Sequence, residues 1–150
     1  MKKIKSFTID HTKLNPGLYV SRIDGDITTY DMRVKKPNEN DLLSNSEMHT
    51  FEHMFATMIR NSEIADDVIY FGPMGCQTGF YLLIRNAADQ QVLETTKRIL
   101  VDISDYSGEV YGSSERECGN FKSLNLEDAQ KVSREYSEIL ISRPVLKLHL

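Results

Sequence analysis

The sequence predicts an α+β fold in which a largely antiparallel β-sheet packs against about three to four helices. Strand-like runs come before and between the helical stretches, and hairpin-type turns join them rather than regular crossovers. The chain of 150 residues is 40% hydrophobic and 27% charged, and it contains no internal repeat, low-complexity stretch or linker. A single domain over residues 1–150, with a hydrophobic core of its own, is therefore expected.

Four strands are predicted in two pairs. The β-like runs LYVSRI and ITTYDMRV flank Asp24-Gly25-Asp26, and an Asp-Gly pair in this position indicates a hairpin. Residues 67–72 (DVIYFG) and 79–85 (GFYLLIR) are rich in β-branched and aromatic side chains and enclose the turn at 73–76, which predicts a second pair. The short run at 109–112 (EVYG) is a candidate for one more strand.

Three helices are predicted from apolar periodicity and from their start and stop signals. The first follows Ser44, which has capping-box spacing to Glu47, and covers about 44–61. The second has its apolar stripe between residues 89 and 108, where a glycine marks its end. The third begins near Asn125 and carries an apolar stripe of its own.

The charge and composition narrow the classes of partner and compartment. The formal net charge is −4, and charged side chains of both signs are spread along the chain. We therefore expect a small molecule or a protein as the partner, rather than nucleic acid or a membrane surface. No apolar signal core follows the N-terminus, and no apolar run approaches the roughly 20 residues of a membrane helix. We therefore expect a cytoplasmic protein, in which Cys76 and Cys118 serve thiol chemistry or metal ligation rather than a disulfide.

The stretch EMHTFEHMF at 47–55 places two imidazoles and a carboxylate on the first helix. Phe51 and Phe55 lie on the side expected to face the sheet, whereas His49 and His53 project from nearly the opposite side and Glu52 lies on the flank. Two histidines at i and i+4 can converge on one ion, and HxxEH is a known metal-ligand pattern. The alternative is a solvated helical face on which these residues fall together by chance.

The two cysteines allow two kinds of metal site. A catalytic site needs a third protein ligand and an open position, and Cys118 in ECGN can complete a His₂Cys set with His49 and His53. A structural site is usually closed by four protein ligands, and Cys76 is the available fourth. Cys76 lies on the glycine-flanked turn GPMGCQTGF, which can present a thiol into a cleft, although a buried structural cysteine is the simpler alternative.

Five segments together resemble one enzyme family. They are SFTIDHT at 6–12, DMR at 31–33, HTFEH at 49–53, PMGCQTGFY at 73–81 and ECGN at 117–120. In this order they resemble the S-ribosylhomocysteine lyases, which make the precursor of autoinducer-2, and the resemblance extends over nearly the whole chain. Five positions differ from the family's usual pattern: Tyr70, Phe71, Gly72, Gln77 and Leu124.

The resemblance implies a role for each residue of the metal motif. His49, His53 and Cys118 would hold one divalent ion per subunit, understood in the family to be Fe²⁺, with Zn²⁺ or Co²⁺ found after oxidation or substitution. Glu52 and Cys76 would be the two general acid/base groups. A water or the substrate would fill the open coordination position.

The resemblance also implies a homodimer with two interfacial active sites. Ser6, His11 and Arg33 match positions that line the substrate pocket from the neighbouring subunit. Without the resemblance, Ser6 could cap a turn, and His11 and Arg33 could be ordinary surface residues.

The activity implied is cleavage of S-ribosylhomocysteine to homocysteine and 4,5-dihydroxy-2,3-pentanedione, within methionine and methyl-cycle recycling. Successive carbonyl shifts along the ribose would be followed by β-elimination. Two alternatives stay open from the residues alone: an HxxEH metallopeptidase in which Glu52 activates a water, and a non-catalytic zinc module with a closed four-ligand site.

Overall fold

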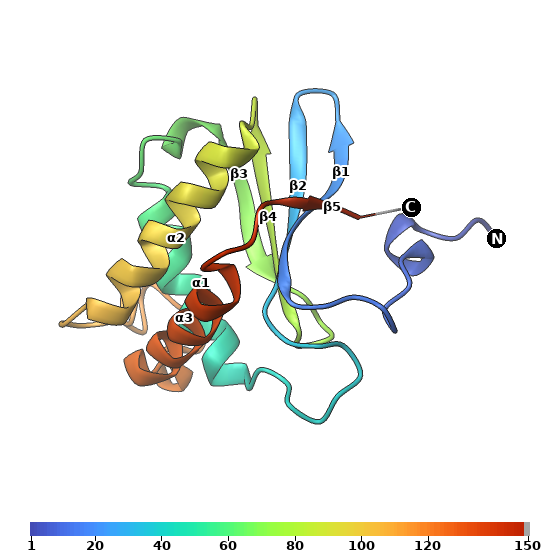
Figure 1. Cartoon of the computed structure of the whole chain (residues 1–150). Helices are drawn as coiled ribbons and strands as arrows, with labels where there is room; N and C mark the ends of the chain where they lie inside the picture. The colour runs from blue at the N-terminus through green and yellow to red at the C-terminus, as the bar shows by residue number, and fades with distance from the viewer. Residues whose placement is uncertain (149–150) are drawn as a thin grey trace.

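One five-stranded sheet and three α-helices make up the protein (Figure 1). A computed structural model describes residues 1–148. The strands are β1 (Gly17–Asp24), β2 (Ile27–Arg33), β3 (Val68–Pro73), β4 (Gly79–Arg85) and β5 (Leu146–Lys147). The helices are α1 (Asn45–Ile59), α2 (Asp89–Asp105) and α3 (Leu126–Leu140), and short 3₁₀ turns lie at Lys5–Thr8, Ala65–Asp67 and Phe121–Ser123.

The sheet is antiparallel except at one edge, which confirms the predicted fold class. Its strand order is β3-β4-β2-β1-β5, and only the pairing of β1 with the two-residue β5 is parallel. The three helices gather on one side of the sheet, while the N-terminal segment lies on the other side (Figure 1). Among residues 1–148, the other face of the sheet carries the N-terminal segment and no α-helix.

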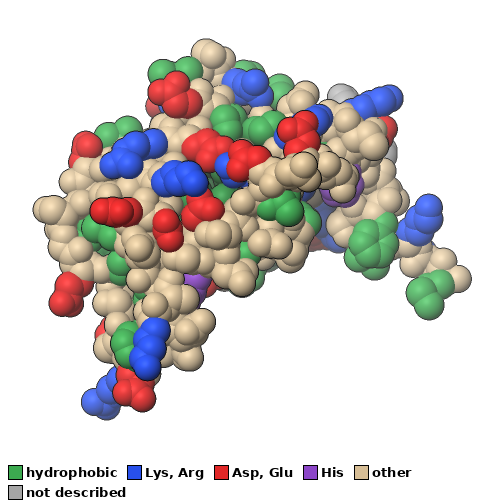
Figure 2. Space-filling model, turned by 90° about the horizontal axis from the view of Figure 1, so that it is seen from below, with side chains coloured by type: hydrophobic (Ala, Val, Ile, Leu, Met, Phe, Trp, Pro, Cys, Tyr) green, Lys and Arg blue, Asp and Glu red, His purple; other side chains and the backbone are tan. Residues whose placement is uncertain are grey.

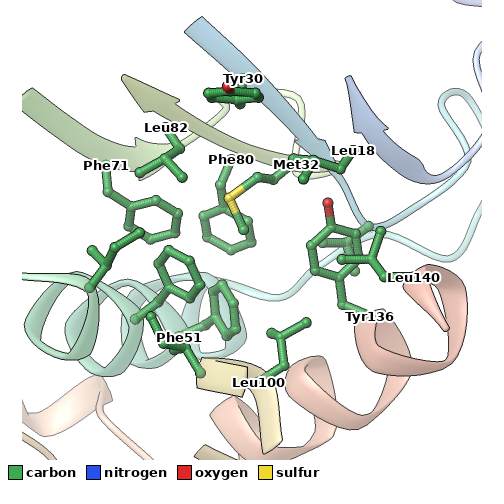
Figure 3. Packing of buried hydrophobic residues seen from close by; sticks show 14 of the residues in the cluster. Leu18, Tyr30, Met32, Phe51, Phe71, Phe80, Leu82, Leu100, Tyr136 and Leu140 are labelled. Atoms are coloured by element: carbon green, nitrogen blue, oxygen red, sulfur yellow. The ribbon is translucent and has the colours of Figure 1, made fainter. Parts of the chain in front are cut away.

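The core lies between the sheet and the three helices, and Phe51, Phe71 and Phe80 lie within it (Figure 3). Phe51 and Phe55 of α1 meet Phe71 of β3 and Phe80 of β4, with ring centroids 4.6 to 6.1 Å apart. At these separations aromatic pairs add about 0.5–1.5 kcal/mol each beyond the burial of their surface. This packing fixes the rotation of α1 and so directs its histidine face away from the sheet.

The helices α2 and α3 form the outer part of the helical layer. Leu100 of α2 and Leu140 of α3 are buried in the same core, and the Tyr136 hydroxyl donates a hydrogen bond of 2.9 Å to the Gly17 carbonyl at the start of β1. Within residues 1–148, none of the helices combines the length and the apolar character that crossing a membrane requires.

The predicted start of α1 is confirmed in detail, and one strand prediction is wrong. Ser44 Oγ accepts from the Glu47 amide at 3.1 Å, and Glu47 Oε1 accepts from the Ser44 amide at 2.9 Å, which completes the capping box. Residues 109–112 form no strand. Gly112 there has a φ of +68°, because the chain turns toward α1 instead of pairing with the sheet.

Candidate functional site

A group of three metal-binding side chains forms where the loop between α2 and α3 meets α1. His49 and His53 come from α1, and Cys118 comes from the loop. Their ligand atoms all lie within 4.8 Å of one another, and the three side chains are partly buried. The Cys118 Sγ lies 3.3 Å from His49 Nε2. The structure thus brings together the three residues that the sequence predicts as a His₂Cys set.

Hydrogen bonds to the far side of each imidazole orient the two histidines. His53 Nδ1 lies 2.8 Å from the Tyr111 carbonyl, which can only accept, so this nitrogen carries the proton. His49 Nδ1 lies 2.6 Å from Ser123 Oγ, and the Ser123 hydroxyl donates to the Asn120 carbonyl at 3.1 Å. Ser123 therefore accepts from His49, and the Nε2 atom of each ring keeps a free lone pair for an ion.

The surroundings of the group also fit a divalent ion. Burial, and then the neighbouring His53, lower the pKa of His49, which favours the neutral ring that can ligate. The Asn120 amide donates to Cys118 Sγ at 3.4 Å. Gly112 lets the loop approach, because a Cβ there would lie 3.2 Å from His53 Nδ1. A set of two imidazoles and a thiolate suits Zn²⁺ or Fe²⁺ and leaves a position open.

Glu52 lies on the flank of α1, beside His53 in the sequence. Its side chain is partly buried. Burial raises the pKa of Glu52 above its ordinary value, and the charge of His53 opposes that rise. The carboxyl group is therefore next to the predicted ligands without belonging to their cluster.

A second group forms around Cys76 on the turn between β3 and β4. The thiol is exposed, and Arg33 NH1 lies 3.9 Å from its Sγ. His11 and Cys76 line one small pocket of about 220 Å³. Arg33 is not a surface residue, because only 1% of it is exposed and Asp31 binds its guanidinium through two bonds of 2.6 and 3.1 Å.

The structure keeps these two groups apart within one chain. Cys76 does not belong to the metal cluster found among the described residues, which argues against a closed four-ligand site built from one chain. Histidine side chains accordingly appear at two separated places on the face shown in Figure 2. Ser6 lies apart from both, in the Lys5–Thr8 turn, where it lines a pocket of about 400 Å³ with Tyr70 and Tyr81 on the sheet face without helices.

Comparison with known proteins identifies the family. The sequence profile of S-Ribosylhomocysteinase (LuxS) matches residues 4–144. The chain belongs to the S-ribosylhomocysteine lyase family. It is 47% identical over 146 residues to the S-ribosylhomocysteine lyase of Borreliella afzelii (strain PKo), covering 93% of each chain. The same-named proteins of Finegoldia magna and Clostridium acetobutylicum are 43% and 42% identical, covering 93% of this chain and 92% of theirs.

Membership of the S-ribosylhomocysteine lyase family confirms the predicted resemblance and leaves the metallopeptidase alternative without support.

Several residues around the two groups were not predicted from the sequence: Ser123 and the Tyr111 carbonyl beside the histidines, and Asp31 and Thr78 beside Arg33. Asp31 carried a usable signal, because residues at i and i+2 of a strand share one face. Ser123 and Thr78 carried none, since nothing in their spacing distinguishes them from other hydroxyl residues.

Proposed function

We propose that the protein cleaves S-ribosylhomocysteine to homocysteine and 4,5-dihydroxy-2,3-pentanedione, the precursor of autoinducer-2. The observation that carries this proposal is the His49, His53 and Cys118 cluster in a chain whose family profile spans residues 4–144. The ligand atoms of these three side chains lie within 4.8 Å of one another, and a catalytic metal site with three protein ligands keeps its fourth position for water or substrate.

The reaction is difficult because homocysteine is a poor leaving group from an unactivated carbon. Moving the sugar carbonyl from C1 to C2 and then to C3 makes the C4 proton acidic, and loss of that proton expels the thiol by β-elimination. His49, His53 and Cys118 would hold a divalent ion, which would supply Lewis-acid stabilisation of negative charge on the sugar oxygens. We propose Fe²⁺ as this ion, with Zn²⁺ or Co²⁺ as substitutes, because the donor set accepts each of them.

The side chains outside the ion's ligands move protons and hold the substrate. Cys76 takes a proton from one carbon and returns it to the next. Glu52 carries the hydroxyl protons and assists the elimination, because its place on α1 keeps it beside the ligands. Arg33, His11 and Ser6 orient the sugar and amino-acid ends of the substrate.

We also propose that the active site is completed in a homodimer. Cys76 shares its pocket with His11 and lies beside Arg33, and the resemblance assigns both of these residues to the neighbouring subunit. Cys76 would then accompany them, so that the thiol of one subunit works opposite the ion of the other. The two free thiols support a cytoplasmic location, where cysteines stay reduced.

Two inactive variants test the reaction and the shared site together. Wild-type protein purified without oxygen should carry about one divalent ion per chain and release a free thiol from S-ribosylhomocysteine. Cys76→Ala should keep the ion and release none, whereas His53→Ala should lose the ion. Co-expressed, the two variants should recover about a quarter of wild-type turnover, because half of the dimers are mixed and each mixed dimer has one intact site.

The outcomes separate the two parts of the proposal. A fully metallated wild type that releases no thiol would refute the lyase. An active wild type whose two variants recover nothing when co-expressed would place Cys76 and the ion in the same subunit and refute the shared site.

A further inference from the structure

We propose that Thr78 is a positioning residue that donates a hydrogen bond to Cys76 and thereby holds its sulfur as a thiolate acceptor. The proposal rests on the function proposed for Cys76. Thr78 is only 2% exposed. Its Oγ1 lies 3.0 Å from Cys76 Sγ and accepts a hydrogen bond of 2.7 Å from Arg33 NH1.

The contact with Arg33 decides the direction of the hydrogen bond to sulfur. A guanidinium has only donors, so Thr78 must be the acceptor toward Arg33. The single hydroxyl proton of Thr78 is then free for its other partner, the sulfur of Cys76. If Cys76 donated instead, this proton would be left buried without a partner, which is costly. The arrangement therefore favours a thiolate that accepts from Thr78.

The backbone around Thr78 holds this hydroxyl in place. The Thr78 carbonyl accepts from the amides of Val34 and Lys35, both at 2.9 Å. The next residue, Gly79, lies so close to β2 that a Cβ there would collide with the Met32 carbonyl. The turn that carries Cys76 is thus fixed against the end of β2, where the Arg33 side chain originates.

Thr78 differs from the charged groups near the thiol because it contacts the sulfur at hydrogen-bond distance. The titratable groups near Cys76 are Arg33 from β2, Tyr81 from β4, and His11 and Glu39 from the adjoining pocket. Asp31 binds the guanidinium of Arg33. Arg33 NH1 is 3.9 Å from Sγ and acts mainly through its charge. Removing the Thr78 hydroxyl would leave all of these charges in the chain, but it would delete both the direct donor to the sulfur and the acceptor for the Arg33 guanidinium.

The test compares Thr78→Val with Thr78→Ser in the metal-loaded enzyme. The rate of Cys76 alkylation by iodoacetamide is measured against pH by mass spectrometry of the Cys76 peptide, and the Cys118 peptide of the same digest is the internal control. Thr78→Val, which keeps the shape of the side chain, should shift the midpoint of the profile upward by about one pH unit or more. Thr78→Ser, which keeps the hydroxyl, should retain the wild-type midpoint.

Activity measurements then separate positioning from folding. Thr78→Val should lower kcat about tenfold or more with little change in KM, and Thr78→Ser should restore it. An unchanged midpoint in a folded Thr78→Val, with or without a fall in kcat, would overturn the proposal. A shifted midpoint in a chain that releases no homocysteine even as wild type would uphold the hydrogen bond and refute only the lyase role of Cys76.

Discussion

Replacing Ser123 by alanine should weaken metal binding about tenfold while leaving the fold intact. The Ser123 hydroxyl accepts from His49 Nδ1 at 2.6 Å and donates to the Asn120 carbonyl at 3.1 Å, so it fixes both the orientation and the tautomer of the ring. One such bond contributes about 1–1.5 kcal/mol, and about 1.4 kcal/mol corresponds to a factor of ten in affinity. Ser123 is only partly buried, so water can replace part of the bond. Residues that orient a metal ligand typically contribute ten- to hundredfold to metal affinity, and we expect the loss of affinity in Ser123→Ala to lie at the lower end of that range.

The assay is a titration of metal-free protein with Co²⁺ or Zn²⁺ in competition with a chromophoric chelator. The matched control is Ser104→Ala, because the Ser104 hydroxyl bonds to the Leu100 carbonyl within α2, outside the site. Affinity in Ser123→Ala within twofold of the wild type would refute the argument that Ser123 fixes the tautomer. An equal loss in Ser104→Ala would show that the effect does not come from the site.

Two further predictions concern the stability of the chain around the thiol, both measured as the free energy of unfolding in urea. Gly79→Ala should lower the free energy of unfolding by about 3 kcal/mol, because its methyl group would press on the backbone of β2. Gly75→Ala is the control and should change this free energy little, because Gly75 has open space around it. Similar losses in both variants would contradict the reasoning. Asp31→Asn should lose about 3–5 kcal/mol, because it leaves the buried Arg33 charge without its partner. The exposed Asp24→Asn is the control, and a loss as large as that of Asp31→Asn would contradict the role of burial.

Most of the fold could be predicted from the sequence because each major helix and strand has a local sequence signal. The Ser44 and Glu47 spacing located the start of α1, and the Asp24-Gly25 pair located the turn between β1 and β2. The two-residue β5 was not predicted, since so short a strand has no periodicity and depends on pairing with β1. The run at 109–112 has strand-like composition but turns instead, because a tertiary bond from His53 to the Tyr111 carbonyl holds it at α1.

Of the residues predicted for the site, the structure brings together the three that one helix face and one loop motif defined. His49 and His53 share a face by helical geometry, and Cys118 joins them as expected. Burial was less predictable: Arg33 looks like a surface residue in the sequence, yet it is buried in the fold, where Asp31 and Thr78 bind its guanidinium. The separation of Cys76 from the ligands could not be predicted either, because it depends on which face of the sheet each turn reaches.

The loop from 106 to 125 is held by Tyr106, Val110 and Tyr111, which pack against the core, and by the site itself. None of its residues is buried, and its ordered contacts with α1 include the bonds of His53 to the Tyr111 carbonyl and of His49 to Ser123. An ion bound through Cys118 would tie this loop to α1. Metal binding and the ordering of the loop would therefore be thermodynamically linked. Free ion at a thousandfold excess over Kd would stabilise the folded chain by about 4 kcal/mol. Metal supply in the cell would then govern how long this segment resists proteases, and protein without its ion would be the form removed first.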